Sequence, residues 1–254
     1  MIRVLSGFTG PGGSTVAFNN LVNLFNENGI KACLYGPHEW KGINCKYKRE
    51  EPLINTDDTV IYHFRMPPSS LCKKIILSSH ETEIFPIKKI KELKYDAVHF
   101  VSEFQKDWQG IDGVVVPNVI GSFSKEFKLK RVAGIIGSLD PNKRTELSIK
   151  RALKDRHTDI RIYGNVTDGK YFQEVIMPLL GPEVSYRGIS SDMSKTYSEL
   201  SDVYHSPKLE TFNLIKFECE AAGVSYHGDE GNDTKAEHWS NERILEAWKT
   251  LLLS

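Results

Sequence analysis

Long hydrophobic runs are absent from this sequence of 254 residues, and no segment approaches the ~20 consecutive apolar residues of a transmembrane helix. An excess of one charge is also absent, because 33 Lys and Arg balance 33 Asp and Glu. No overall field therefore draws the chain to nucleic acid or an anionic membrane. The first residues lack the basic start and apolar stretch of a secretory signal.

Cysteine is scarce, and its spacing excludes the common metal and redox motifs. The four cysteines form no CxxC pair and no cluster with histidine at metal-ligand spacing; they are Cys33, Cys45, Cys72 and Cys219. Reduced thiols are the simplest interpretation. With 40% hydrophobic and 26% charged residues, the composition is typical of a globular protein. We therefore expect a cytoplasmic protein without a transmembrane segment, and the sequence leaves its oligomeric state open.

Short apolar runs alternate with polar or helix-periodic segments along the whole chain, a pattern typical of parallel α/β sheets. The runs cover residues 2–5, 31–35, 59–62, 74–77, 97–101, 113–116, 132–137, 159–163 and 184–186. A stretch rich in Pro, Asn, Gly, Ser and Lys, at 117–130, separates the first six from the rest. We therefore expect two Rossmann-like, doubly wound domains, 1–120 and 130–235. A C-terminal helix within 236–254 should pack back across them.

A glycine-rich loop, Gly7 to Ser14, lies between the first expected strand and the first helix. It nearly matches the P-loop of nucleoside triphosphatases, but Gly13 stands where that motif has the lysine that reaches the outer phosphates. Gly12 and Gly13 still suit an anion at a helix N-terminus, where free N–H groups and the helix dipole favour negative charge. A tight turn without a ligand is the alternative that these residues leave open.

Two glutamates in the second half, Glu210 and Glu218, are separated by seven residues. They follow a strand-like run that stops at Pro207, and Ala221-Ala222-Gly223 comes after them. Two glutamates at this spacing are usually a solvated pair. In this context they resemble the E-x7-E donor motif of retaining glycosyltransferases, family 4 in particular, where a strand ends before Glu-Gly-Phe-Gly and a helix carries Glu-Ala.

The resemblance assigns different tasks to the two glutamates. It implies that Glu210 lies against the reacting sugar and that Glu218, on the helix, accepts hydrogen bonds from the ribose hydroxyls. The helix N-terminus would hold the diphosphate. The residues of the motif between them are expected to bind the donor as well; they are Thr211, Phe212, Asn213 and Leu214. Thr211 and Asn213 depart from the glycines of the motif.

Segments upstream are similar to the same family in the right order. Gly137 to Lys143 resembles its Gly-Arg-Leu and Lys segment, which makes Lys143 the expected phosphate-binding lysine. Ser138 replaces the arginine of the family, and Arg144 or Arg187 can stand in for it. Gly164 follows a strand as in the family.

The first half resembles the family more weakly. Val115 to Asn118 is similar to a Val-Pro-Asn at the end of its first domain. His80 is similar to a histidine that contacts the donor sugar, and a surface histidine at a strand end is the alternative.

The resemblance implies the GT-B architecture, in which two Rossmann-like domains flank a donor cleft. It implies a hexosyl- or pentosyltransferase that retains the anomeric configuration, with Glu210, Lys143 and His80 as catalytic residues. No metal or other cofactor is expected, because Lys143 and backbone amides would neutralise the leaving diphosphate of the nucleotide-sugar donor. The sequence also has no Asp-x-Asp motif.

The acceptor stays open at this point. A glycan or a lipid-linked sugar is the default of the family. A modified DNA base is an alternative that would explain the short chain and two basic stretches, 88–94 and 125–131. A non-catalytic sugar-nucleotide-binding protein is the alternative of another class, because Ser138 and the lost glycines depart from the motif.

Overall fold

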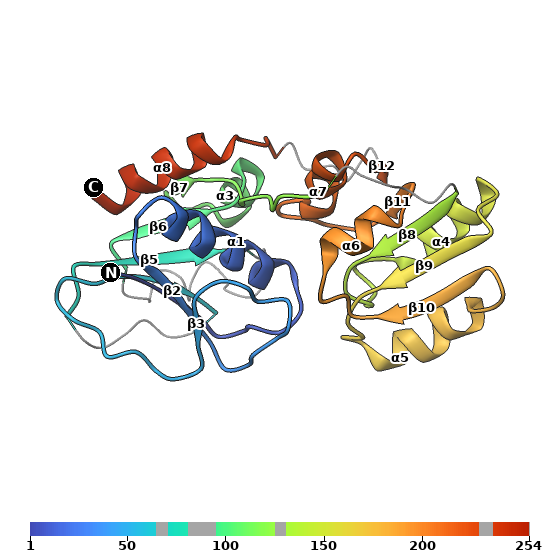
Figure 1. Ribbon diagram of the computed structural model, residues 1–254, viewed down its shortest axis with the longest axis horizontal. Coiled ribbons are helices and arrows are strands. Elements are labelled where there is room, and N and C mark those ends of the chain that lie inside the picture. The colour runs from blue at the N-terminus through green and yellow to red at the C-terminus, as the bar shows by residue number, and fades with distance from the viewer. Residues whose placement is uncertain (65–70, 81–94, 125–130, 229–235, 254) are drawn as a thin grey trace. The chain divides into compact units, whose positions relative to one another are not determined.

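The computed structural model describes residues 1–64, 71–80, 95–124, 131–228 and 236–253. The chain divides into two compact units, Met1–Val119 with Thr234–Ser254, and Ile120–Asp233. Each unit contains one sheet, with seven strands in the first unit and five in the second (Figure 1). The expected α/β class with two sheets is therefore confirmed.

The sheet of the first unit has the strand order β3-β2-β1-β4-β5-β6-β7, and every pair is parallel. Its strands are β1 (Ile2–Ser6), β2 (Ala32–Tyr35), β3 (Tyr47–Lys48), β4 (Thr59–His63), β5 (Lys74–Ser79), β6 (Ala97–Phe100) and β7 (Val114–Val115). All residues of β2, β4 and β5 are buried. This burial explains why these strands read as continuous apolar runs rather than as an alternating pattern.

Three helices of the first unit lie within its described residues: α1 (Gly13–Glu27), α3 (Glu103–Gln109) and α8 (Asn241–Leu253). The helix α1 buries one apolar face and ends before Gly29, whose φ of +75° suits glycine. At the C-terminus, α8 buries Ile244, Leu245 and Trp248 in the same core as α1. Trp248 meets the ring of Phe25 edge-on, with 5.8 Å between the ring centroids.

The sheet of the second unit has the order β10-β9-β8-β11-β12 and is also parallel. Its strands are β8 (Val132–Ile136), β9 (Asp159–Tyr163), β10 (Val184–Gly188), β11 (Asp202–His205) and β12 (Ser225–Gly228). Its α-helices are α4 (Thr145–Lys154), α5 (Gly169–Tyr171), α6 (Met193–Ser198) and α7 (Leu214–Ala222).

Residues 169–179 are helical but do not form one α-helix. The short α5 continues as a π-helical turn, Phe172–Ile176, and then as a 3-10 turn, Met177–Leu179. Pro178 lies in the 3-10 turn, and proline has no N–H to continue an α-helical ladder. In the described ranges, no helix is long and apolar enough to cross a membrane.

Both sheets reverse their strand order at one position, which fixes where a ligand is expected. The reversal lies between β1 and β4 in the first unit and between β8 and β11 in the second. In open parallel sheets, ligands bind outside the carboxyl ends of the strands at such a switch point. The loops that follow β8 and β11 are therefore the first place to look for a site in the second unit.

Candidate functional site

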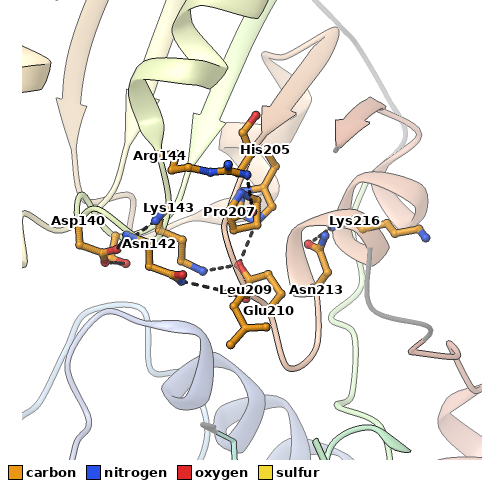
Figure 2. Close-up of polar contacts among 12 residues, drawn as sticks. Asp140, Asn142, Lys143, Arg144, His205, Pro207, Leu209, Glu210, Asn213 and Lys216 are labelled. Carbon is orange, nitrogen blue, oxygen red and sulfur yellow. Dashed lines mark hydrogen bonds and ion pairs between the residues drawn. The ribbon is translucent and has the colours of Figure 1, made fainter. Parts of the chain in front are cut away.

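An ion pair joins the two loops at the switch point of the second unit (Figure 2). Lys143, in the loop after β8, donates from Nζ to Oε1 of Glu210, in the loop after β11. Both side chains are largely shielded, with 22% of Lys143 and 14% of Glu210 exposed. The structure thus brings together two of the three residues that the resemblance makes catalytic, which are 67 positions apart in the chain.

A third group, His205 at the end of β11, completes this cluster. Its Nε2 lies 3.0 Å from the same Oε1 of Glu210, and His205 is 3% exposed. Burial opposes the ionisation of Glu210, but the Lys143 ammonium and the hydrogen bond from His205 outweigh it and lower the pKa of Glu210 to about 2. Glu210 is therefore a carboxylate at any physiological pH.

The loop after β8 is shaped by the carboxylate of Asp140. Its Oδ1 accepts hydrogen bonds from the backbone N–H groups of Asn142 (2.9 Å) and Lys143 (3.1 Å). Its Oδ2 accepts from the hydroxyl of Ser138 at 2.6 Å. Ser138, which stands in place of the arginine of the family, thus helps to shape the turn that presents Lys143.

The two loops are also tied together through backbone carbonyl groups. The side chain of Asn142 donates to the carbonyl of Leu209 at 3.1 Å. The guanidinium of Arg144 donates from Nε to Ser206 O (2.7 Å) and from Nη2 to Pro207 O (2.9 Å). Arg144 therefore braces the loops, and these ties fix the backbone on both sides of the ion pair.

The N-terminus of α7 explains how the chain does without one of the two glycines of the motif. Asn213 is the N-cap: its side chain accepts from the N–H of Lys216 and donates to the hydroxyl of Tyr226 at 2.6 Å. Its φ of −79° is open to any residue, so this position needs no glycine. Next to it, the buried Phe212 packs on Phe217 with 5.0 Å between ring centroids. Thr211 and Leu214, which stand on either side of Phe212 and Asn213 in the sequence, are partly exposed.

Glu218 lies inside α7 and is 4% exposed. Its Oε2 accepts a hydrogen bond of 2.8 Å from the hydroxyl of Tyr197 in α6. Burial raises the pKa of Glu218 to about 7, although the hydrogen bond from Tyr197 acts in the opposite direction. Glu218 is therefore no solvated surface carboxylate, and that alternative is wrong for this residue. Its contact with ribose stays a prediction.

Two other expected donor residues lie at the carboxyl ends of β9 and β10. Gly164 follows β9, and a Cβ atom there would lie 1.7 Å from the carbonyl oxygen of Gly137. Close approach of two backbone segments therefore requires glycine at this position. Arg187 is exposed on β10, the edge strand, which is separated from β8 by β9.

The remaining expected residues belong to the first unit. Gly12 is the N-cap of α1, and Gly13 is the first residue of that helix. In the same first turn, Thr15 is 1% exposed, and its Oγ1 has no hydrogen-bond partner within the described structure. A buried polar atom without a hydrogen-bond partner is rare, so the hydroxyl of Thr15 is available to a ligand or a water molecule.

His80 follows β5 and is 8% exposed. The surface alternative for this histidine is therefore wrong. Burial, followed by the proximity of His63 and His99, lowers the pKa of His80 well below its usual value, so the ring is neutral.

Sequence reasoning missed His205 of this cluster, and it missed Asp140 and Asn142, which shape and tie down the loop that carries Lys143. His205 carries a detectable signal, because it ends a strand five residues before Glu210. Of the basic stretches, residues 88–94 and 125–130 lie outside the described residues. Within the described part of the chain, no group of three His, Cys, Asp or Glu side chains is arranged to hold a metal ion.

The fold resembles that of known glycosyltransferases. The Anabaena protein Alr3699/HepE, solved with UDP and glucose, matches with a TM-score of 0.66 and 13% identity over 98% of this chain and 89% of its own. AviGT4, a glycosyltransferase of avilamycin A biosynthesis, matches with a TM-score of 0.65 and 15% identity over 99% and 88%. TarM matches with a TM-score of 0.54 and 17% identity over 78% of this chain, which spans about half of TarM (48%).

Of these neighbours, AviGT4 is a glycosyltransferase, and the two parallel sheets of this chain agree with the expected pair of Rossmann-like domains. At such identities the likeness shows the fold alone. No protein-family model matches the sequence, and no curated protein matches it.

The buried Glu218 predicts a pH dependence of stability. Its pKa is raised from 4.5 to about 7 in the folded protein, so the folded state holds a proton that the unfolded chain releases at lower pH. Its contribution to the free energy of unfolding is therefore fully present below pH 4.5 and is lost as the pH rises to about 7. At roughly 1.4 kcal/mol per pKa unit, the full loss is on the order of 3 kcal/mol.

Chemical denaturation between pH 5 and pH 8 measures this effect. Glu218→Gln keeps an acceptor for Tyr197 and removes the titration, so the mutant should become more stable relative to wild type as the pH rises. Glu220→Gln, an exposed position on the same helix, is the matched control and should show no such trend. A constant difference between Glu218→Gln and wild type across this range would contradict the prediction.

Proposed function

We propose that this protein is a glycosyltransferase that moves a sugar from a nucleoside-diphosphate sugar to an acceptor, with the donor bound at the carboxyl edge of the second sheet. The observation that carries the proposal is the cluster of Lys143, Glu210 and His205 at the switch point of that sheet. The N-termini of α4 and α7 begin directly after the two loops of this cluster. Such N-termini favour an anion such as a diphosphate.

The charges of this cluster fit the transition state of sugar transfer. Negative charge develops on the leaving diphosphate, and the three N–H donors of Lys143 can serve Glu210 and a phosphate oxygen together. Positive charge develops on the sugar ring as its bond to phosphate breaks. Glu210, an ionised carboxylate held by His205 and Lys143, would lie against that ring. The arrangement stabilises both charges without a metal ion.

Glu218 has a second task in this proposal, the recognition of ribose. Its burial disfavours the charged carboxylate, and hydroxyl groups that donate to it would restore the charged form. The hydroxyl of Tyr197 already orients one of its oxygens. We assign retention of the anomeric configuration to the reaction from the likeness of the motif, and a cytoplasmic location from the composition.

The acceptor is proposed to be a glycan or a lipid-linked sugar. A hollow of about 380 Å3 lies beside the carboxyl ends of β1 and β2 in the first unit. Its lining includes the polar side chains of Tyr35, Arg49, Glu50 and Glu51. Such groups suit the hydroxyls of a sugar, whereas two carboxylates disfavour a phosphate backbone. A modified DNA base is the less favoured acceptor, and a non-catalytic sugar-nucleotide binder is the alternative without turnover.

UDP-glucose is the first donor to test, because HepE was solved with UDP and glucose. Thermal shift against UDP-, GDP- and other nucleotide sugars would identify the donor, and the release of nucleoside diphosphate would measure turnover. Slow release with no acceptor present supports an enzyme. Binding without any release, with or without a glycan acceptor, would favour the non-catalytic alternative.

Loss of the Lys143 ammonium should slow turnover strongly. Lys143→Ala is expected to lower kcat on the order of a hundredfold, as the removal of one preorganised charge does at other active sites. Lys150→Ala, an exposed lysine on α4, is the control and should retain activity. Wild-type turnover in Lys143→Ala would remove this lysine from the chemistry.

The two glutamates should be separable by kinetics. Glu210→Gln should mainly lower kcat, because the carboxylate meets charge that exists only in the transition state. Glu218→Gln should mainly raise the KM of the donor, because hydrogen bonds to ribose are equally strong before and during the reaction. Circular dichroism confirms folding, and calorimetry measures nucleoside diphosphate binding. The opposite division of effects, or normal transfer by both variants, would show that the assignment is wrong.

Turnover should survive EDTA, because fixed cationic and N–H groups replace the divalent ion at the diphosphate. Turnover is measured after dialysis against EDTA and again after the addition of Mn²⁺ or Mg²⁺. Activity that disappears with EDTA and returns with either ion would reject the metal-independent mechanism.

A further inference from the structure

Three buried histidines gather at the carboxyl ends of β4, β5 and β6 in the first unit: His63, His80 and His99. Their exposed fractions are 1%, 8% and 3%. The ring of His80 lies 5.2 Å from that of His63 and 6.1 Å from that of His99, measured between centroids. Phe18 of α1 packs on His80 at 4.7 Å. The family resemblance gives a role only to His80 of these three.

A chain of hydrogen bonds connects His80 to a backbone carbonyl. Nε2 of His80 lies 3.2 Å from Oγ of Ser78, and the same Oγ lies 2.8 Å from Nδ1 of His99. Nε2 of His99 lies 2.8 Å from the carbonyl oxygen of Val116. Ser78 is 1% exposed, so every member of the chain is shielded from water.

The carbonyl at the end of this chain determines where each proton lies. A carbonyl oxygen only accepts, so Nε2 of His99 must carry the proton, and Nδ1 of a neutral His99 must accept. Ser78 then donates its single hydroxyl proton to His99 Nδ1. Its oxygen can face Nε2 of His80 only as an acceptor, so His80 Nε2 must carry a proton as well.

Both rings are neutral, as this argument requires. Burial lowers the pKa of His99 to about 4, although its hydrogen bond to Val116 acts in the opposite direction. The uncharged side chains of Phe18 and Ser78 contact His80, Trp248 contacts His99, and the ring of His63 lies beside His80.

We propose that the Val116 carbonyl, His99 and Ser78 form a positioning chain that holds His80 in its Nε2–H tautomer. This role rests on the proposed glycosyltransferase function and on the family resemblance, which implies that His80 contacts the donor sugar. In that tautomer Nδ1 is the accepting nitrogen, so any group that meets it must be a donor such as a hydroxyl. Trp248 of α8 packs on His99 with 4.5 Å between centroids. The C-terminal helix α8 therefore holds His99, at the far end of this hydrogen-bond chain, in place.

His63 serves as an internal reference, because its proton is expected on Nδ1, whereas that of His80 is expected on Nε2. Ser6 donates its hydroxyl proton to the carbonyl of Phe8 at 2.5 Å. Its oxygen lies 3.3 Å from Nδ1 of His63 and must accept there, which places the proton of His63 on Nδ1. Two adjacent buried histidines should thus differ in tautomer.

Long-range ¹H–¹⁵N correlation spectra of the full chain, labelled with ¹⁵N-histidine, report these tautomers directly. His63→Gln, His80→Gln and His99→Gln assign the signals. We expect Nε2–H for His80 and His99 and Nδ1–H for His63. In Ser78→Ala, His99 should keep its tautomer because the carbonyl still holds it, whereas His80 should lose its preference. An Nδ1–H form of His80 in the wild type, or an unchanged tautomer of His80 in Ser78→Ala, would show that this hydrogen-bond chain does not hold His80.

Enzyme kinetics test whether this hydrogen-bond chain contributes to the reaction with the donor. Ser78→Ala should lower kcat/KM for the donor about tenfold, the value of roughly one buried hydrogen bond, and Ser78→Thr should restore it by restoring the hydroxyl. A lost tautomer preference with unchanged kcat/KM would overturn the positioning role. If the wild type transfers no sugar at all, the proposed function fails, and the spectra still decide whether the chain exists.

Discussion

The ion pair between Lys143 and Glu210 is the interaction on which the candidate site depends. It joins two loops that are far apart in the sequence, and it forms where the sheet of the second unit reverses its strand order. Because both side chains are largely shielded, the cost of removing them from water offsets much of their attraction, so the pair is no strong source of stability by itself. Its importance is chemical, because it places a cation and an ionised carboxylate side by side next to two helix N-termini.

The surroundings of this pair are built to hold it in one geometry. Asp140 shapes the turn that carries Lys143, and Arg144 fastens the facing loop through its backbone carbonyls. His205 gives Glu210 a second partner that does not depend on the lysine. When a diphosphate takes up hydrogen bonds of Lys143, Glu210 therefore keeps a donor, and its charge stays in position.

Sequence reasoning predicted the parts of the fold that depend on local patterns. Buried strands such as β4 and β5 are continuous apolar runs, so they were recognisable, whereas the two-residue β3 has no pattern of its own. Residues 169–179 are helical but pass from α to π to 3-10 geometry, with Pro178 in the 3-10 turn, and residue spacing does not show such a change. Lys143 and Glu210 were identified through the order of motifs, since periodicity says nothing about which loops meet.

The missed features depend on contacts across the fold. The burial of Glu218 against Tyr197 and the role of Asp140 follow from the packing of separate elements, which residue spacing does not encode. Asn213 shows the reverse case: a departure from the motif that suggested a damaged site is a helix cap with ordinary backbone angles. Motif comparison therefore overstated the cost of losing that glycine.

The central claim is that the cluster of Lys143, Glu210 and His205 receives the diphosphate of a nucleotide sugar. A crystal structure with bound nucleoside diphosphate tests it most directly. The account predicts a phosphate oxygen within hydrogen-bond distance of Lys143 Nζ, about 3 Å, with Glu210 still accepting from His205. A diphosphate bound elsewhere on the chain, with the Lys143–Glu210 pair untouched, would contradict it.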